Sequence, residues 1–427
     1  MTGLRLGCIA DDFTGATDLA NNLARSGMRV VQAIGVPRRR LDVDVDAVVV
    51  ALKTRTVPSA EAVAQSLDAL RWLREHAAEQ IYFKYCSTFD STPKGNIGPV
   101  TEALMDALAD LPGGDFTIAT PAFPDNNRTV FKGHLFVGDV LLNESGMQHH
   151  PLTPMTDANL VRVLQAQCHR TVGLVDYQVV ARGPDAIRAR FDALRRQGVG
   201  IAIVDAISND DLIRLAPALK AMPLVTAGSG VGIALAPNFG IALSNVSTAL
   251  PRAVGAKAAI AGSCSQATSR QVRTFIAAGG AAFAVDPLQL AAGVDVAEHA
   301  LAWCAPRLER GPVLVYSTAE PALVKSVQER LGAARAGAMI EATLAAIARG
   351  LVSLGARQLV VAGGETAGAC VQALNITQME IGPQIDPGVP WCYAHTDGES
   401  AVALHLALKS GNFGADDFFS KAFALLQ

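Results

Sequence analysis

Short apolar runs alternate with amphipathic segments along almost the whole chain. The segments between the runs repeat apolar residues at helical spacing, for example Val63, Leu67 and Leu70, in a helix for which Ser59 is the expected N-cap. Such alternation predicts an α/β fold whose mainly parallel sheets are covered by helices. The runs that predict the first strands are RLGCIA (5–10), VVQAIGV (30–36), AVVVALKT (47–54), IYFKYC (81–86), FTIATPAF (116–123), VGLVDY (172–177), GIAIVDAI (200–207) and PLVTAG (223–228).

The pattern is interrupted once and then restarts. Residues 236–255 have little periodicity and contain Pro237, Gly240 and Pro251, which is typical of a linker. A chain of 427 residues also exceeds one typical core. We therefore predict two Rossmann-like α/β domains, 1–247 and 248–427. The runs that predict strands of the second domain are AKAAIAG (256–262), AAFAVDP (281–287), PVLVYST (312–318) and QLVVAGG (358–364).

Composition narrows the class of protein. Half of the residues are hydrophobic and 18% are charged, which suits a globular enzyme rather than a disordered chain. The net charge of −3 provides no basic field for nucleic acid or for an anionic membrane. The seven cysteines include no CxxC pair, no signal peptide is evident, and no apolar run reaches membrane-spanning length. We expect a cytoplasmic protein with reduced cysteines.

Four predicted strands end in turns of small or polar residues that lead into helices. They are ADDFTGAT (10–17), TAGSGVG (226–232), AGSCSQAT (261–268) and AGGETAGA (362–369). Backbone N–H groups at a helix start bind anions, so these turns suit a phosphorylated ligand. The chain contains no GxxxxGK[ST] motif, and Ile233 interrupts the one candidate GxGxxG.

These turns differ in how strongly they indicate a ligand. We favour ligand contact for Gly363, Gly364, Glu365 and Thr366, where Glu365 could reach a metal or a ribose hydroxyl. Ser263 and Ser265 offer hydroxyls to a ligand at another predicted helix start, but N-capping of that helix would favour the same residues. For Gly228–Gly232, the sequence supports tight strand–helix packing and ligand contact equally.

A second polar cluster, KYCSTFDSTPKGNIG (84–98), follows an apolar strand. Lys84 lies inside that strand. Burying its amine costs free energy unless the amine is paired or contacts a ligand. Ser87, Thr88 and Asp90 then crowd the strand end, and together with Lys84 they could bind a small polyhydroxy acid. Otherwise Lys84 extends to water beside an ordinary polar turn. Arg55 is a second candidate for holding a carboxylate.

The chain contains long motifs in a fixed order: ADDFTGATDLANNL (10–23), KYCSTFDSTPKGNIGPV (84–100), TPAFPDNNRTV (120–130), GHLFVGDVLLNESGMQHHPLTPMTDANLVRVLQ (133–165), TAGSGVG (226–232), AGSCSQAT (261–268), AGGETAGA (362–369) and LKSGNFG (408–414). Together these motifs resemble those of the four-carbon acid sugar kinases over nearly the whole chain. The resemblance implies a sugar-acid-binding domain at 1–247, a nucleotide-binding domain at 248–427, an active site in the interdomain cleft, and ATP with Mg²⁺.

The same resemblance implies a transfer of the γ-phosphoryl group of ATP to the C4 hydroxyl of a four-carbon acid. Asp12 is our expected base and Asp11 the expected orienting or substrate-binding group. Both can face the site only if the strand has ended before them, because adjacent strand residues face opposite sides. The other expected substrate contacts are Arg55, Lys84, Ser87, Thr88 and Asp90, and the expected ATP contacts are Ser263, Gly363, Gly364, Glu365, Thr366 and Gly411.

Several alternatives remain open at the level of sequence. We favour a 3-oxo-tetronate as the acceptor over D-threonate or D-erythronate, and an enzyme over a non-catalytic sugar-acid sensor. Residues 124–156 are dense in Asn, Gly, His and Pro, and we expect them to form a long functional loop or flap. The pattern identifies no metal ligands and leaves a homo-oligomer open.

Overall fold

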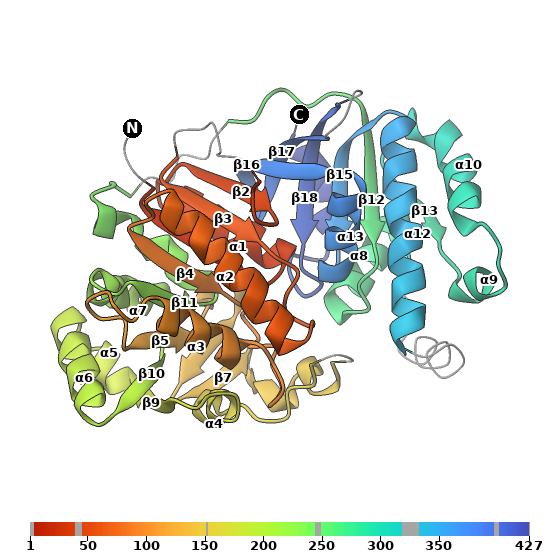
Figure 1. Ribbon diagram of the computed structural model, residues 1–427. Coiled ribbons are helices and arrows are strands. Elements are labelled where there is room, and N and C mark those ends of the chain that lie inside the picture. Colours follow the sequence, from red (N-terminus) through yellow and green to blue (C-terminus); the bar gives the residue numbers. More distant parts are fainter. Residues whose placement is uncertain are drawn as a thin grey trace. The chain divides into compact units, whose positions relative to one another are not determined.

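The computed structural model describes residues 4–38, 45–150, 153–243, 249–317, 333–396 and 401–426. The chain divides into two compact units, Met1–Ser247 and Thr248–Gln427, and each has its own helices and strands (Figure 1). Most of the neighbouring strands in each unit are parallel, so the predicted α/β class is confirmed.

The sheet of unit 1 is parallel throughout, in the order β2-β3-β1-β4-β11-β5-β10-β9. Its neighbouring strands β1 and β3 are apolar and buried along their whole length, as expected for strands covered on both faces. The strands are β1 (Leu6–Ala10), β2 (Val30–Ile34), β3 (Ala47–Ala51), β4 (Gln80–Lys84), β5 (Thr117–Thr120), β9 (Thr171–Val175), β10 (Val199–Val204) and β11 (Leu224–Ala227).

The chain leaves β1 and its neighbour β3 in opposite directions along this sheet. From β1 it passes through α1 to β2, whereas from β3 it passes through α2 to β4 on the other side of β1. Ligands of open α/β sheets bind at such a reversal, outside the carboxyl ends of the strands. The helices of unit 1 are α1 (Phe13–Arg25), α2 (Ser59–Glu75), α3 (Ile97–Ala107), α4 (Leu160–Gln165), α5 (Tyr177–Val180), α6 (Pro184–Arg196) and α7 (Asn209–Leu215).

Two expectations for unit 1 were wrong in detail. Ser59 is the first residue of α2 rather than its N-cap, which is Pro58, and the Ser59 hydroxyl donates to Asn96 Oδ1 at 2.8 Å. The segment expected to be a long loop contains a small antiparallel sheet, β6 (Arg128–Phe131), β7 (His134–Val137) and β8 (Val140–Leu141). Short 3₁₀ turns complete the unit: η1 (Pro124–Asn126), η2 (Leu142–Glu144), η3 (Gly146–His149), η4 (Ala216–Leu219), η5 (Gly230–Ala234) and η6 (Ala236–Phe239).

The sheet of unit 2 has the order β13-β14-β12-β15-β18-β17-β16. The strands from β13 to β18 in this order are parallel, and β17 pairs antiparallel with β18 and β16. The strands are β12 (Ala256–Ala261), β13 (Ala281–Ala284), β14 (Val313–Tyr316), β15 (Ala356–Ala362), β16 (Ile376–Asp386), β17 (Val389–Thr396) and β18 (Ala403–Lys409). The helices are α8 (Gln266–Ala277), α9 (Pro287–Ala291), α10 (Val296–Leu308), α12 (Ala333–Ser353), α13 (Gly364–Ala373) and α14 (Phe418–Ala424).

Helix α12 is apolar over much of its length. Its segment Ala336–Ser353 has a mean hydropathy of 1.3, so by length and composition alone it could cross a membrane. The expectation that no apolar run reaches membrane-spanning length therefore does not hold for α12. Core helices of globular proteins pass the same test, and α12 packs on α10 and α13.

Candidate active site

Asp11 and Asp12 follow β1 at the point where the strand has ended. Asp11 N–H donates to the carbonyl of Lys84 at 3.0 Å, and Asp12 is the N-cap of α1. The Asp12 carboxylate accepts from Gly15 N–H at 2.9 Å and from the Thr14 hydroxyl at 2.7 Å. Because neither residue belongs to the strand, their side chains do not alternate between the two faces of the sheet.

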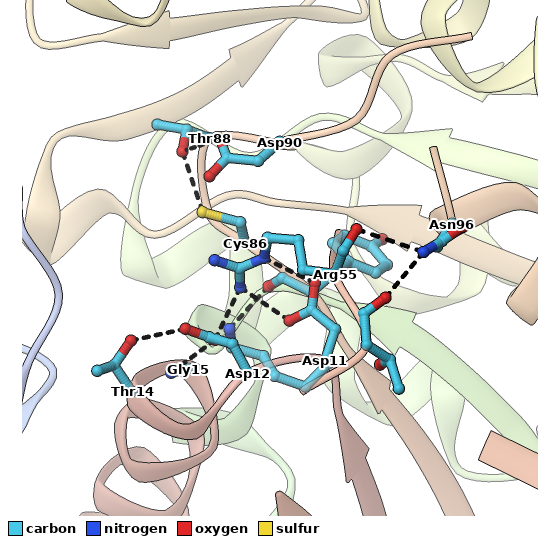
Figure 2. Close-up of polar contacts among 12 residues, drawn as sticks. Asp11, Asp12, Thr14, Gly15, Arg55, Cys86, Thr88, Asp90 and Asn96 are labelled. Atoms are coloured by element: carbon cyan, nitrogen blue, oxygen red, sulfur yellow. Dashed lines mark hydrogen bonds and ion pairs between the residues drawn. The ribbon is translucent and has the colours of Figure 1, made fainter. Parts of the chain in front are cut away.

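Arg55, in the loop after β3, binds both aspartates (Figure 2). Its Nε and Nη2 donate to the two carboxylate oxygens of Asp11 at 2.9 and 2.8 Å, and Nη2 also donates to Asp12 Oδ1 at 2.7 Å. Burial would lower the pKa of Arg55, but Asp11 and Asp12 raise it well above its usual range. Burial raises the pKa of Asp11, and Arg55 opposes this effect. Arg55, which was expected to hold a substrate carboxylate, thus binds the carboxylate of Asp11 through two hydrogen bonds.

Lys84, at the end of β4, is 1% exposed and lies against the start of α1. Its Nζ donates to the Tyr85 carbonyl at 2.7 Å, and a Cβ atom on Gly15 would lie only 2.9 Å from it. Burial would raise the pKa of Asp12, but Arg55 and Lys84, with the hydrogen bonds to the carboxylate, hold it below its ordinary value. Asp12 is therefore ionised at neutral pH.

The loop that follows β4 adds a chain of polar groups beside Arg55 (Figure 2). Thr88 donates to Asp90 Oδ1 at 2.6 Å, and the Cys86 sulfur lies 3.0 Å from the Thr88 hydroxyl. Burial and Asp90 raise the pKa of Cys86 to about 12, so its thiol stays protonated. Asn96, which the sequence reading missed, donates to the carbonyls of Thr54 and Val57 at 2.8 and 2.9 Å and so holds the loop that carries Arg55.

A small cavity joins these elements. Asp11, Arg55 and Asp90 line it together with Thr54, Phe83, Asn96, Ile97 and Val100. Its volume of about 10 Å³ is close to the space that one water molecule needs. The structure thus brings Asp11, Asp12, Arg55, Lys84, Thr88 and Asp90 to one edge of the sheet. Ser87 is buried in the same loop, but no described hydrogen bond joins it to this group.

Asp18 is a third carboxylate near this edge that sequence reasoning missed. It lies on α1, is 3% exposed, and its Oδ1 accepts no hydrogen bond from the described residues. Burial raises the pKa of Asp18 to about 7, and the positive charge of Lys84 opposes the shift. Arg128, at the start of β6, is also buried, and its pKa is lowered by burial although Asp90 and Asp18 favour its charge.

We expect Asp18→Asn to become more stable relative to wild type as the pH rises from 5 to 8. A carboxyl group whose pKa is raised from 3.8 to about 7 on folding stabilises the protein most at low pH, and this contribution is lost as the pH rises through 7. Asn does not titrate, so the difference in melting temperature should shift by a few degrees, at roughly 2–4 °C per kcal/mol. Calorimetry at several pH values measures it.

The control for this prediction is Asp46→Asn. Burial would raise the pKa of Asp46, but Arg29 holds it below its ordinary value, so the stability that Asp46 contributes is lost as the pH falls. This loss occurs below the ordinary pKa of 3.8, so the stability of Asp46→Asn relative to wild type should stay nearly constant from pH 5 to 8 and improve only at more acid pH. Equal pH dependence in the two variants would contradict the raised pKa of Asp18.

A separate set of predicted residues converges in unit 2. The strand register places Ala261, Ala362 and Lys409 side by side at the carboxyl ends of β12, β15 and β18. Gly363, with φ of 119°, begins the turn after β15, and a Cβ atom there would lie 3.1 Å from Ser263 N and 3.2 Å from Thr366 Oγ1. The three turns that carry Ser263, Gly363–Thr366 and Gly411 therefore meet at one edge.

The Gly411 turn is joined closely to the turn after β12. A Cβ atom on Gly411 would overlap the Ser263 hydroxyl, and Ser265 Oγ donates to the Gly411 carbonyl at 2.5 Å. Ser265 is also the N-cap of α8, so the capping interpretation is correct for this serine. With α13 beginning at Gly364, two helix N-termini lie at this edge, which suits an anionic ligand.

The glycines after β11 are explained by packing. A Cβ atom on Gly228 would lie 3.0 Å from the carbonyl oxygen of Pro121, and one on Gly230 would overlap the carbonyl of Ala122. The backbone here needs glycine to approach the neighbouring loop. Of the two open interpretations for this turn, close packing is the one that these contacts support.

No group of three or more His, Cys, Asp and Glu side chains suited to a metal occurs within the described ranges. Mg²⁺ in phosphoryl-transfer enzymes is held by substrate phosphates, water and one or two carboxylates, so it does not need such a group. Glu365, in the first turn of α13, is the carboxylate closest in sequence to the glycine turn. The donors present therefore fit a metal that enters with a nucleotide.

Comparison with known proteins extends these observations to the whole chain. Residues 6–235 match the profile described as a sugar-binding N-terminal domain, and residues 258–419 match that of a nucleotide-binding C-terminal domain. A 3-oxo-tetronate kinase of Pseudomonas fluorescens is 56% identical over 426 residues, covering 99% of this chain and 97% of that protein. One of Burkholderia multivorans is 57% identical over 425 residues, with the same coverage.

Solved structures agree with this assignment of the fold. A Salmonella typhimurium LT2 protein, described as a tRNA synthase, has a TM-score of 0.84 at 41% identity, covering 99% of this chain and all of its own. A Haemophilus influenzae protein has a TM-score of 0.74 at 44% identity, with the same coverage. With both domain profiles matched and relatives similar over their full length, the chain belongs to the four-carbon acid sugar kinase family.

Proposed function

We propose that this chain transfers the γ-phosphoryl group of ATP to the C4 hydroxyl of a 3-oxo-tetronate. The observation that carries the proposal is the full-length similarity, at 56% and 57% identity, to proteins named 3-oxo-tetronate kinase. The chemistry of the two units supports it. Unit 1 gathers carboxylates and cations suited to a sugar acid, and unit 2 gathers glycine turns and helix N-termini suited to phosphates.

On the acceptor side, Asp12 accepts the proton of the C4 hydroxyl. An ionised carboxylate in hydrogen-bonding reach can orient this hydroxyl and take its proton as the bond to phosphorus forms. Arg55 orients Asp12 and Asp11 through Nε and Nη2, which leaves Nη1 for the substrate's own carboxylate. Lys84 adds a second positive charge. The remaining hydroxyl and carbonyl oxygens are assigned to Asp11, Ser87, Thr88 and Asp90.

On the donor side, the phosphates lie against the N-termini of α8 and α13. Ser263, Gly411 and the Gly363–Thr366 turn provide N–H and hydroxyl donors, a role supported by their convergence at one sheet edge. Glu365 would hold Mg²⁺ or a ribose hydroxyl. Mg²⁺, when bound with ATP, neutralises charge that develops on the β- and γ-phosphates.

Direct phosphoryl transfer requires the acceptor oxygen to lie in line with the γ-phosphate. The proposal therefore includes one active site to which both Rossmann-like domains contribute, 1–247 with the acid and 248–427 with the nucleotide. Closure of the domains would exclude water and limit hydrolysis of ATP. A cytoplasmic location is supported by the seven cysteines, all of which are free thiols.

A substrate panel tests the proposal. Purified protein with ATP and Mg²⁺ is offered 3-oxo-tetronate, D-threonate and D-erythronate, ADP release is followed, and the position of the new phosphate is determined by NMR. We expect kcat/KM for the 3-oxo acid to exceed the others by at least about tenfold. A preference for D-threonate or D-erythronate would overturn the substrate assignment. Binding of an acid without ADP release would favour a sensor.

A further inference from the structure

Lys409 ends β18 with its ammonium group fully buried among oxygen atoms. The residue is 0% exposed. Nζ donates to the Thr268 hydroxyl at 3.1 Å and to the carbonyls of Ser410, Gly411 and Phe413 at 2.9, 3.2 and 3.1 Å. Burying an ammonium group is costly unless such partners replace water, so this arrangement calls for an explanation.

The contacts of Lys409 join the Gly411 turn to the first turn of α8. The Gly411 carbonyl accepts from Lys409 and also from the hydroxyls of Ser265 and Thr268, at 2.5 and 2.8 Å. Three donors on one carbonyl leave little freedom to the turn. Gln271, on α8, continues the connection by donating to the carbonyls of Phe413 and Gly414, both at 2.9 Å.

Lys84 in unit 1 has the same backbone setting as Lys409. Each lysine is the last residue of its strand, and its carbonyl accepts from the residue that begins the neighbouring turn: Asp11 for Lys84, and Gly363 for Lys409, at 3.0 and 2.8 Å. Their surroundings differ, because Lys84 acts on the carboxylates of Asp12 and Asp18, whereas the contacts of Lys409 are carbonyls and a hydroxyl.

The charge of Lys409 is therefore not cancelled by a carboxylate in hydrogen-bond contact within the described part of unit 2. Burial lowers the pKa of Lys409 to about 7, and the more distant Asp386 opposes this shift. Asp386 itself accepts from the Lys421 ammonium and from Ala415 N–H. All four neighbours of Lys409 Nζ are hydrogen-bond acceptors, so the protonated form, with its three N–H donors, fits this cage, and an anion bound at the turns would favour it further.

We propose that Lys409 is a positioning residue for the nucleotide, which holds the Gly411 turn against α8 and places a positive charge behind the phosphate site. The inference rests on the proposed function, since it takes Gly411 and Ser263 as nucleotide contacts. Lys409 acts through the turn and does not touch the phosphates, because its ammonium group is enclosed by the carbonyls that it binds. Its loss should consequently weaken the binding of ATP more than it slows the chemical step.

The test replaces Lys409 by Met, which keeps the length of the side chain and removes the charge and the donors. We expect KM for ATP and the Kd of Mg²⁺–ATP, measured by calorimetry, to rise at least about tenfold, the equivalent of 1.4 kcal/mol. The change in kcat at saturating ATP should be smaller, and KM for the acid should stay within about twofold. Lys257→Met is the matched control, because Lys257 lies near the opposite end of β12 in the same unit, and it should leave both KM values unchanged.

A second variant covers the case in which Lys409→Met fails to fold. Thr268→Val removes only the hydroxyl that accepts from Lys409 and donates to Gly411. It should also raise KM for ATP, by a smaller factor than Lys409→Met does. The double variant should show less than the sum of the two effects, because both act on one carbonyl. An unchanged Kd for ATP in Thr268→Val and in folded Lys409→Met would overturn the inference. An equal rise in KM for ATP and for the acid would also overturn it.

The proposed function can fail independently of this result. If wild type turns over no acid in the substrate panel, the kinase assignment fails. The Kd of Mg²⁺–ATP still compares wild type with Lys409→Met in that case. Wild-type turnover together with unchanged nucleotide affinity in the variants would reject the role of Lys409 alone.

Discussion

Asp12→Asn is expected to lower kcat by about 10²–10⁴-fold while the affinity for ATP stays nearly unchanged. Asn is as good an N-cap as Asp, so the hydrogen bond from Gly15 N–H to this side chain and the start of α1 should survive. What the variant removes is the charge that accepts the proton of the C4 hydroxyl. The effect should therefore fall on turnover and not on the fold.

Steady-state kinetics with both substrates varied, together with a melting temperature, measure this effect. Asp176→Asn makes the same exchange at another N-cap of unit 1, that of α5, and should leave turnover intact. Asp11→Asn should raise KM for the acid more than it lowers kcat, since Asp11 is assigned to orientation and binding. Near-normal turnover in Asp12→Asn would remove Asp12 as the base.

Arg55→Met is expected to destabilise unit 1 by about 3–5 kcal/mol and to abolish measurable turnover. The guanidinium group is the shared partner of Asp11 and Asp12, whose side chains are 8% and 14% exposed. Without it, two adjacent carboxylates remain buried and repel one another. The loss should grow as the pH rises from 5.5 to 8, because the carboxylates then lose protons that would have relieved the repulsion.

Urea unfolding at the two pH values measures this loss. The control is Arg29→Met, which breaks the pair with Asp46 at the surface, where the Arg29 side chain is 51% exposed, and should cost less than about 1 kcal/mol. Adding Asp11→Asn to Arg55→Met should recover part of the stability and none of the turnover. A loss in Arg55→Met no larger than in the control would show that the pair contributes little.

Most parallel strands of both units were predictable from the sequence. Each is a short apolar run that ends in Gly, Asp or a polar turn, and burial on both faces leaves no other pattern for such a strand. The antiparallel strands β16 and β17 were not predicted. Pro383 and Pro390 interrupt the apolar pattern there, although the turn at Pro387–Gly388, where Gly388 has φ of 78°, is a hairpin signal that could have revealed them.

The location of the candidate site was also predictable, because of the geometry of a parallel sheet. The carboxyl ends of parallel strands share one edge, so polar turns far apart in the sequence become neighbours. The register that pairs Ala10 with both Ala51 and Lys84 makes this concrete in unit 1. The residues that support the site were not predictable in the same way, since Asn96 reads as an ordinary polar residue in a turn.

The sequence by itself determined the α/β class, the polar strand ends and, through long ordered motifs, the kinase family. Only the tertiary structure decided how the charged side chains are used. Arg55 binds the two aspartates across more than 40 residues of chain, and Lys409 binds Thr268 across 141. Asp18 lies on the polar side of α1, away from Ala16 and Leu19, where an amphipathic helix ordinarily meets water. Packing buries that side as well, and no local sequence pattern shows this burial. Burial raises the pKa of Asp18, and it makes the hydrogen-bond and charge partners of Lys84, Arg55 and Lys409 necessary to offset the cost of burying their charges.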